Sequence, residues 1–361
     1  MCAEEQIAAF KKALGSVISC GLARGSRSNP AASLRILSTF GTPVLMSGLG
    51  SLVLSSKEAA AIDQQFKKTL QNIMKLSSRS PAALVYFTAG SLPGAAIIHL
   101  RQLSLFGMIC RLPSDPLNHH ARHVLLTASY NQNSWFVQVR NLLQQYQLPH
   151  PLLLLEQKLP KEQFKKQIKA KVVDYWEIKL RQEAAFLPSL SYFNTAYYSL
   201  SKPHKLWTTA GQKPYEVSKA RIQLLFLCSQ YPSGSRTRHW SPENPLGLCS
   251  FPPCRIEETV ETPEHILLDC AAYKLTRKKL ISMCLRLKNS TSHSIAISFL
   301  TAHTASDALQ LLLDCSSIPE VILAAQLSGE IIYNDLFYIG RSWCFSIHRE
   351  RMKMLGRWNL W

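Results

Sequence analysis

The spacing of apolar residues along this chain is helical almost throughout. Apolar side chains recur every three or four positions in Glu5 to Ile18, in Ser55 to Ser78 and in Lys158 to Leu187, as on one face of an α-helix. Ser55 and Glu58 form a capping box that begins the second of these helices. Strand-like alternation is almost absent, and there is no internal repeat. The pattern therefore predicts a mainly α fold.

Prolines and glycines divide the chain into further helices and into four segments. Pro43 and three nearby glycines should interrupt an apolar helix over residues 31–54. Further helices are expected over residues 81–89, 92–112, 133–147, 214–228 and 307–315, and within 319–355. We expect a helical bundle over residues 1–150, a basic helical linker with an aromatic-rich connection over 151–213, a small module over 214–285, and C-terminal helices over 286–361.

The chain is strongly basic. Of its 361 residues, 41 are Lys or Arg and 23 are Asp or Glu, so the formal net charge is +18. Such an excess favours a polyanionic partner, and we expect RNA or DNA. Trp240 could stack on unpaired bases, although a solvated helix face is the alternative for the basic groups. The predicted nucleic-acid-binding residues are Lys57, Lys68, Lys75, Arg79, Lys161, Lys165, Lys166, Lys169, Arg236, Arg238, Trp240, Lys274, Arg277, Lys278 and Lys279.

Cysteine usage and the N-terminal sequence indicate an intracellular protein, of the nucleus or cytoplasm. Ten cysteines in a chain of this length do not indicate a disulfide scaffold, and most of them stand among apolar residues as buried free thiols do. The first residues do not form a basic-then-apolar leader, and the longest apolar stretches are too short to cross a membrane. Neither a membrane nor a small-molecule substrate is expected as a partner.

Four cysteine and histidine residues have the spacing of a metal site. Cys249, Cys254, His265 and Cys270 form the pattern C-x4-C-x10-H-x4-C. Three thiolates with one imidazole suit a closed, structural Zn²⁺ site. Thr262 is a natural N-cap and Pro263 suits a first helical position, so His265 should lie one turn into a short helix.

Two features count against this metal site. At about 100° per residue, five steps place His265 and Cys270 about 140° apart on an α-helix, so the last turn would have to loosen. The prolines between the first two cysteines remove amides that could bond to sulfur. The alternative is that the four side chains simply fill a core. However, the segment also carries charged residues that a core disfavours: Arg255, Glu257, Glu258, Glu261 and Glu264.

The sequence lacks the residues that polymerases and metal nucleases need. Such enzymes hold two divalent ions with clustered carboxylates. The chain has only seven aspartates and none are adjacent, and Asp335 offers one carboxylate where a polymerase motif has two. A lysine-bearing Gly-rich phosphate loop and a nucleophile elbow are also missing. We expect no catalytic residues in this chain.

Four segments together suggest a known family. Residues 31–48 look like its thumb segment, and residues 103–111 fit its Leu-Phe-Gly helix. Residues 236–273, with the C-x4-C-x10-H-x4-C pattern and a following Tyr273, look like its terminal zinc knuckle. Residues 337–351, which read FYIGRSWCFSIHRER, look like its closing helix. The chain thus resembles the C-terminal region of the reverse transcriptase polyprotein of non-LTR (LINE-type) retrotransposons, of Jockey-like and chicken-repeat-like lineages.

This resemblance implies a thumb-like helical domain and a CCHC zinc knuckle that holds Zn²⁺ through the four ligands named above. It also implies a role in holding template RNA and target DNA. The polymerase fingers and palm of the family, and its endonuclease, would precede residue 1, so we expect a non-catalytic RNA- or DNA-binding remnant. Two alternatives stay open. One is the C-terminal part of a functional reverse transcriptase whose polymerase core is encoded upstream, and the other is a helical protein-interaction module or a non-functional relic.

Overall fold

The protein is built from α-helices joined by short helical turns. The computed structural model describes residues 3–19, 28–112, 116–129, 133–239, 241–301 and 304–356. Within these residues the only β-structure is an isolated antiparallel bridge between Leu248 and Val260. The mainly α fold predicted from the sequence is therefore confirmed.

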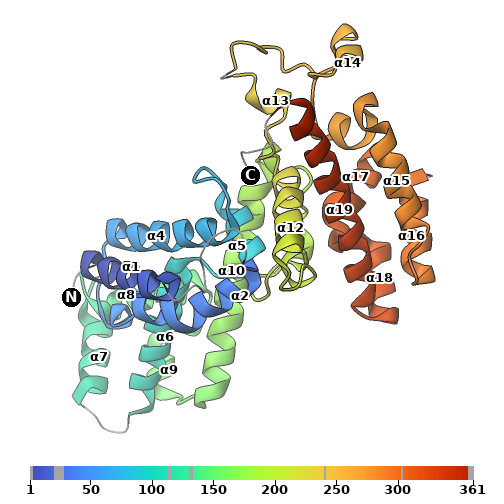
Figure 1. Ribbon diagram of the computed structural model, residues 1–361. Coiled ribbons are helices and arrows are strands. Elements are labelled where there is room, and N and C mark those ends of the chain that lie inside the picture. Colours follow the sequence, from blue (N-terminus) through green and yellow to red (C-terminus); the bar gives the residue numbers. More distant parts are fainter. Residues whose placement is uncertain are drawn as a thin grey trace.

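The helices gather in two groups, and α10 and α12 lie between them in the view of Figure 1. The first part of the chain forms α1 (Ala3–Ser19), α2 (Pro30–Ile36), the π-turn η2 (Leu37–Gly41), α3 (Thr42–Leu45), η3 (Leu49–Ser51), α4 (Ser56–Met74), α5 (Ala82–Ala89), α6 (Gly94–Arg111), α7 (Pro116–Thr127), α8 (Trp135–Gln145), α9 (Pro151–Glu156) and α10 (Lys161–Ala185). The remainder forms η4 (Pro188–Leu190), η5 (Thr195–Tyr197), α11 (Lys205–Thr208), α12 (Pro214–Leu227), α13 (Gly234–Thr237), α14 (Pro252–Ile256), the π-turn η6 (His265–Asp269), η7 (Ala271–Tyr273), α15 (Lys274–Cys284), α16 (Ser290–Thr301), α17 (Ala305–Asp314), η8 (Cys315–Ser317), α18 (Pro319–Ser328) and α19 (Ile331–Met354).

Helix α4 begins as its sequence predicts. The Ser55 hydroxyl accepts a hydrogen bond from the Glu58 N–H at 3.3 Å, and the Glu58 carboxylate accepts one from the Ser55 N–H at 2.9 Å. These two bonds satisfy amides that the helix start leaves unpaired. The helix ends earlier than predicted, because Lys75 adopts a left-handed conformation with φ 59°.

The apolar stretch over residues 31–54 is broken, as its proline and glycines predict. A π-turn separates α2 from α3, and α3 begins around Pro43. Gly48 then takes φ 71°, which ends the helical run before η3. The pieces fold as a bent segment rather than as one helix.

The hydrophobic interior does not follow the expected segment boundaries at residues 150, 213 and 285. One core runs from Phe10 in α1 to Ile347 in α19, through both groups of helices. A second core joins α6 to α10, and α10 contributes Phe164 and Ile168 to it. Leu180, further along α10, packs in the first core. The expected linker helix is therefore an integral part of the packing.

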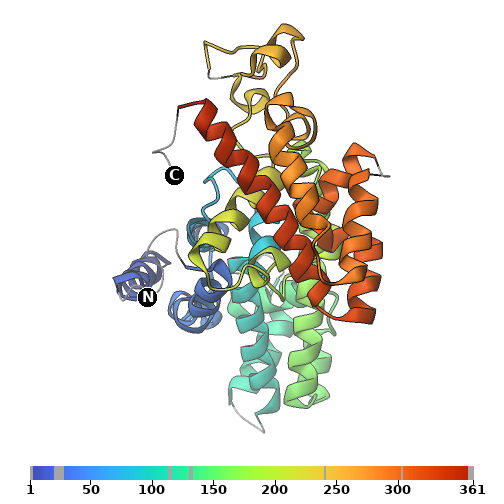
Figure 2. The ribbon, with the colours of Figure 1, turned by 45° about the vertical axis from the view of Figure 1, so that its right-hand side comes forward.

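Helix α19 lies at the centre of the second group (Figure 2). It packs against α12, α15 and α17. Gly340 allows this close approach, because a Cβ atom there would clash with the Leu312 carbonyl oxygen and lie 2.6 Å from Gln223 Nε2. The Arg341 side chain is buried and donates to the Thr209 hydroxyl at 2.8 Å. A basic residue of the closing helix thus forms hydrogen bonds inside the protein rather than lying on its surface.

Among the described residues, no single helix has the length and apolar composition needed to cross a membrane. Two pairs of helices, over residues 82–111 and 305–328, reach this length and apolar composition when each pair is taken as one segment, but each pair is bent between its two helices.

Candidate metal centre

The first two cysteines are held by a short hairpin-like loop. Residues 247–261 fold back on themselves around the Leu248–Val260 bridge, and the Cys249 N–H donates to the Thr259 carbonyl at 2.9 Å. Cys254 lies on the short helix α14 inside this loop, and its carbonyl accepts from the Thr259 N–H at 2.9 Å. The two cysteines are therefore fixed by backbone hydrogen bonds on both sides of the loop.

The other two ligands lie at the ends of the π-turn η6. Thr262 caps this turn, since its hydroxyl accepts from the His265 N–H at 3.1 Å. The Cys270 N–H donates to the His265 carbonyl at 2.7 Å, a bond between residues five apart. A turn closed by this bond brings the first residue and the sixth together, whereas an α-helix would separate them by about 140°. The helical turn between His265 and Cys270 is therefore widened to a π-turn, as their spacing required for both side chains to reach one metal ion.

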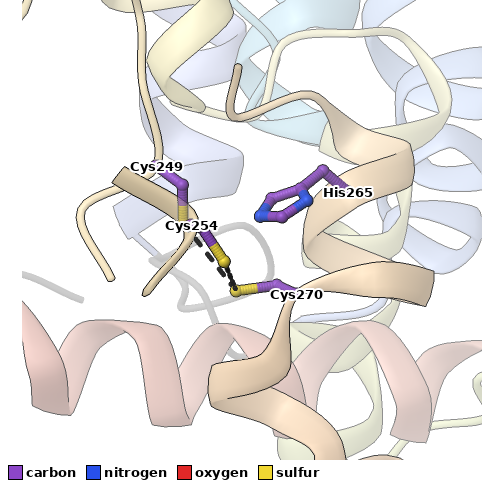
Figure 3. Close-up of side chains that lie close together, drawn as sticks. All are labelled: Cys249, Cys254, His265 and Cys270. Carbon is purple, nitrogen blue, oxygen red and sulfur yellow. Dashed lines mark hydrogen bonds between the residues drawn. The ribbon is translucent and has the colours of Figure 1, made fainter. Parts of the chain in front are cut away.

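All four side chains are buried and converge on one point (Figure 3). Their candidate ligand atoms lie within 4.8 Å of one another. The Cys270 sulfur is 3.8 Å from the Cys249 sulfur and 3.9 Å from the Cys254 sulfur. The imidazole faces the three sulfurs in Figure 3, and Nε2 of His265 is buried without a hydrogen-bond partner. A buried nitrogen of this kind needs a partner, and a metal ion would supply one. These four residues could therefore hold a metal ion.

The electrostatics of the cluster favour a thiolate. The sulfurs of Cys270 and Cys249 lie 3.8 Å apart, and the hydrogen bond between them holds the pKa of Cys249 below its ordinary value. The pKa of Cys270 is raised, chiefly by the same neighbour and then by burial. The backbone amides of Phe251 and Ala272 also bond to these two sulfurs, so the prolines in the loop do not deprive it of amides. One negative charge forms readily, and a cation would offset the repulsion that opposes further ionisation.

Helix α19 supports the centre through a buried ion pair that the sequence did not predict. Arg351 donates to the two carboxylate oxygens of Glu261 at 2.9 and 2.8 Å. Glu261 also accepts from the Gly234 N–H at 2.6 Å, and the Tyr231 ring lies 5.5 Å from the guanidinium. From the same helix, the Trp343 indole donates to the Leu267 carbonyl in the π-turn at 3.0 Å.

The five charged residues of this segment differ in their placement, and Glu264 is half-buried and accepts from the Tyr192 hydroxyl at 2.8 Å. Arg255, Glu257 and Glu258 are exposed on the loop, as expected for residues that a core disfavours. Glu261 differs, because it is buried and paired with Arg351. Both residues occur in the segments that carry the family resemblance, but no pattern in the sequence showed that they form a pair.

The predicted nucleic-acid-binding residues differ in how far their side chains are exposed to solvent. Arg236 is half-buried and donates to the Ser229 carbonyl. Arg277 is half-buried and donates to the Asp269 carbonyl at 3.1 Å, beside the metal centre, where burial lowers its pKa. Trp240 lies outside the described residues. The remaining predicted side chains are exposed: Lys57, Lys68, Lys75, Arg79, Lys161, Lys165, Lys166, Lys169, Arg238, Lys274, Lys278 and Lys279.

The aromatic pair at the end of the basic run of α10 has partners inside the protein. The Trp176 indole donates to the Tyr146 hydroxyl at 3.0 Å, and the Tyr175 ring meets the Tyr146 ring edge-on at 5.1 Å. These contacts favour packing in the interior over base stacking for Tyr175 and Trp176.

The Cys₃His set is the only group of three or more His, Cys, Asp or Glu side chains placed to share a metal ion in the described part of the chain. Comparison with protein-family models, with curated proteins and with solved structures returns no match.

Proposed function

We propose that this protein is a non-catalytic, zinc-stabilised nucleic-acid-binding protein related to the C-terminal region of non-LTR retrotransposon reverse transcriptases. The observation that carries the proposal is the buried Cys₃His set followed directly by α15. That helix presents Lys274, Lys278 and Lys279 to solvent. A rigid centre of this kind can hold a basic helix in a fixed position against a phosphate backbone.

Zinc is the metal that this set of ligands favours. Three thiolates and one imidazole are typical of structural zinc sites. A tetrahedral ion with zinc–sulfur bonds of about 2.3 Å requires sulfur atoms ~3.8 Å apart. The sulfur separations of 3.8 and 3.9 Å support this assignment. When bound, zinc would join the loop of Cys249 and Cys254 to the π-turn of His265 and Cys270.

Metal content tests the zinc assignment. We expect one zinc per purified chain, and we expect Cys254→Ser and His265→Ala to lose it. His119→Ala is the matched control, because this histidine is exposed and far along the chain from the centre. Chelation should loosen the centre and leave the core of α6 to α10 folded, since that core contains none of the four ligands. A metal-free protein whose melting profile does not change with chelator would refute the assignment.

A salt titration tests nucleic-acid binding. Phosphate contacts release counterions, so log affinity should fall linearly with log salt concentration, by roughly 10³–10⁵ between about 50 and 200 mM for six to ten contacts. Replacing Lys274, Lys278 and Lys279 with Ala should flatten the slope for duplex DNA by up to about three units. Arg277 is left intact in this variant because its hydrogen bond lies beside the metal centre.

The same experiment separates the alternatives. If single-stranded RNA, single-stranded DNA and duplex DNA all fail to bind below about 10 µM at about 50 mM salt, the basic groups are a solvated surface. The interaction-module alternative then replaces the proposal. An in-frame polymerase core immediately upstream in the transcript would instead favour the C-terminal part of a working reverse transcriptase.

A further inference from the structure

A second candidate site lies away from the metal centre. A pocket of about 570 Å³ opens between the C-terminal end of α4, helix α12 and helix α19. Its volume falls in the range of roughly 300–1,000 Å³ that ligand sites occupy. Its walls are largely apolar and include Met74, Leu76, Ile222, Leu225, Phe345 and Met352.

The charged residues that line this pocket all have the same sign. Lys75, Arg221 and Arg349 line it, and no Asp or Glu does. Lys75 and Arg349 are exposed, whereas Arg221 is buried and donates to the Ser28 carbonyl at 3.3 Å. Lys57 and Lys68 are exposed on the same face of α4, and Lys75 follows directly after the C-terminal end of this helix. The cations at the pocket therefore continue the positive charge of α4.

Aromatic side chains lie on the α12 and α19 side of the pocket. Tyr215 is 55% exposed, and its ring meets the Phe345 ring edge-on at a centroid distance of 5.2 Å. A flat base that entered the pocket between these rings and the aliphatic side chains would lose water from both of its faces. Stacking of this kind tolerates any base, because every base has a π-face.

We propose that this pocket takes up one unstacked base of a single-stranded nucleic acid, while Lys75 and Arg349 hold the neighbouring phosphates. The inference rests on the proposed function, since it names a ligand class for the same basic protein. A duplex keeps its bases stacked and paired, so it can reach the cations but not the pocket. Single-strand affinity should therefore depend on the pocket walls, and duplex affinity should not.

Two variants separate the contribution of the pocket walls to binding from that of the cations. Phe345→Leu keeps an apolar side chain but removes the π-face. Lys75→Asn with Arg349→Gln removes two charges, and Asn suits the left-handed conformation at residue 75, where φ is 59°. The matched control is Arg286→Gln with Lys288→Gln, which removes two exposed charges that do not line the pocket.

The probes are single-stranded oligouridine and oligothymidine of about 12 nucleotides, each with one 2-aminopurine, and a duplex of the same length. We expect Phe345→Leu to weaken single-strand binding by about fivefold or more at constant salt, and to leave duplex binding unchanged. The double charge variant should flatten the single-strand salt slope by about 1.4 units. The control variant should leave that slope unchanged. Zinc content and melting temperature verify that each variant is folded.

The outcomes distinguish this inference from the proposed function. If the unaltered protein binds none of the probes, the proposed function fails. If it binds but the pocket variants behave like the control, or lose single-strand and duplex affinity equally, only the pocket inference is overturned. A fluorescent fatty acid that binds in a Phe345-dependent way, with oligonucleotide affinity insensitive to Phe345→Leu, would assign the pocket to anionic amphiphiles and also overturn it.

Discussion

Replacing Arg351 with Met should weaken the attachment of the closing helix to the candidate metal centre. The side chains of Arg351 and Glu261 are only 8% and 4% exposed. Burial disfavours the guanidinium charge, but hydrogen bonding to Glu261 and its negative charge raise the pKa of Arg351 above its ordinary value. Met keeps an apolar chain in the same space and leaves the carboxylate with the Gly234 N–H as its remaining donor among the bonds described above.

The expected loss of stability is large for a single substitution. Breaking a buried ion pair by removing one partner costs about 3–5 kcal/mol, because the other charge is left uncompensated. Since one short hydrogen bond to Glu261 remains, we expect about 3 kcal/mol at neutral pH. The proposed zinc ion should also leave the variant faster on addition of chelator, because the Glu261 N–H donates to the Gly247 carbonyl and closes the loop that carries Cys249 and Cys254.

Urea unfolding of the purified protein measures this effect, with Lys353→Met as the control on the same helix. Lys353 forms a surface pair with Glu350 at 3.0 Å, with side chains 40% and 34% exposed, so its loss should cost about 0–1 kcal/mol. Glu261→Gln combined with Arg351→Met should be more stable than the sum of the two single losses predicts. An Arg351→Met loss no larger than that of Lys353→Met, or strict additivity in the double variant, would refute the reasoning.

Three further predictions follow from packing, burial and composition. Gly107→Ala should destabilise the protein by about 1–3 kcal/mol in thermal unfolding, because a Cβ atom there overlaps the Phe164 ring, and a second change, Phe164→Leu, should recover part of the loss. Burial raises the pKa of Asp314 to about 7, beside a His204 whose pKa burial lowers to about 3. A carboxyl group whose pKa is raised by folding lowers the free energy of unfolding as pH rises, and Asn at this position cannot ionise. The free energy of unfolding of Asp314→Asn, relative to that of the unaltered protein, should therefore increase by up to about 1.4 kcal/mol per pH unit between about pH 4 and 7. A difference that does not change with pH would contradict this. The chain alone should not extend a primer with Mg²⁺ or Mn²⁺, and extension that survives substitution of Asp307, Asp314 and Asp335 would reveal an active site elsewhere.

The sequence by itself determined the features that depend on neighbouring residues. Helix periodicity and the Ser55–Glu58 capping box specify α4, because those interactions lie within one or two turns. The interruption of residues 31–54 follows from the fixed φ of Pro43 and the freedom of Gly48. The four candidate ligands were also predictable, since the types and spacing of cysteine and histidine are properties of the sequence alone.

Periodicity was insufficient where polar and apolar residues mix evenly. Helix α16, Ser290–Thr301, was not predicted. Its sequence STSHSIAISFLT alternates serine with apolar residues and carries no clear 3.6-residue stripe. Ala296 and Phe299 nevertheless pack in the large core, so tertiary contacts determine this helix.

Only the tertiary structure decided how the candidate metal centre is assembled and which charged residues pair beside it. Residues 265–270 form a π-turn, and the Trp343 indole of α19 donates to the Leu267 carbonyl within it, a contact that no local pattern shows. Glu261 resembles a surface residue in the sequence, yet Arg351, 90 positions away, allows its burial. Arg277 resembles the lysines beside it, but its guanidinium reaches the Asp269 carbonyl while they remain in solvent. A charged residue's role is set by the partner that folding brings to it, and that partner is invisible in the local sequence.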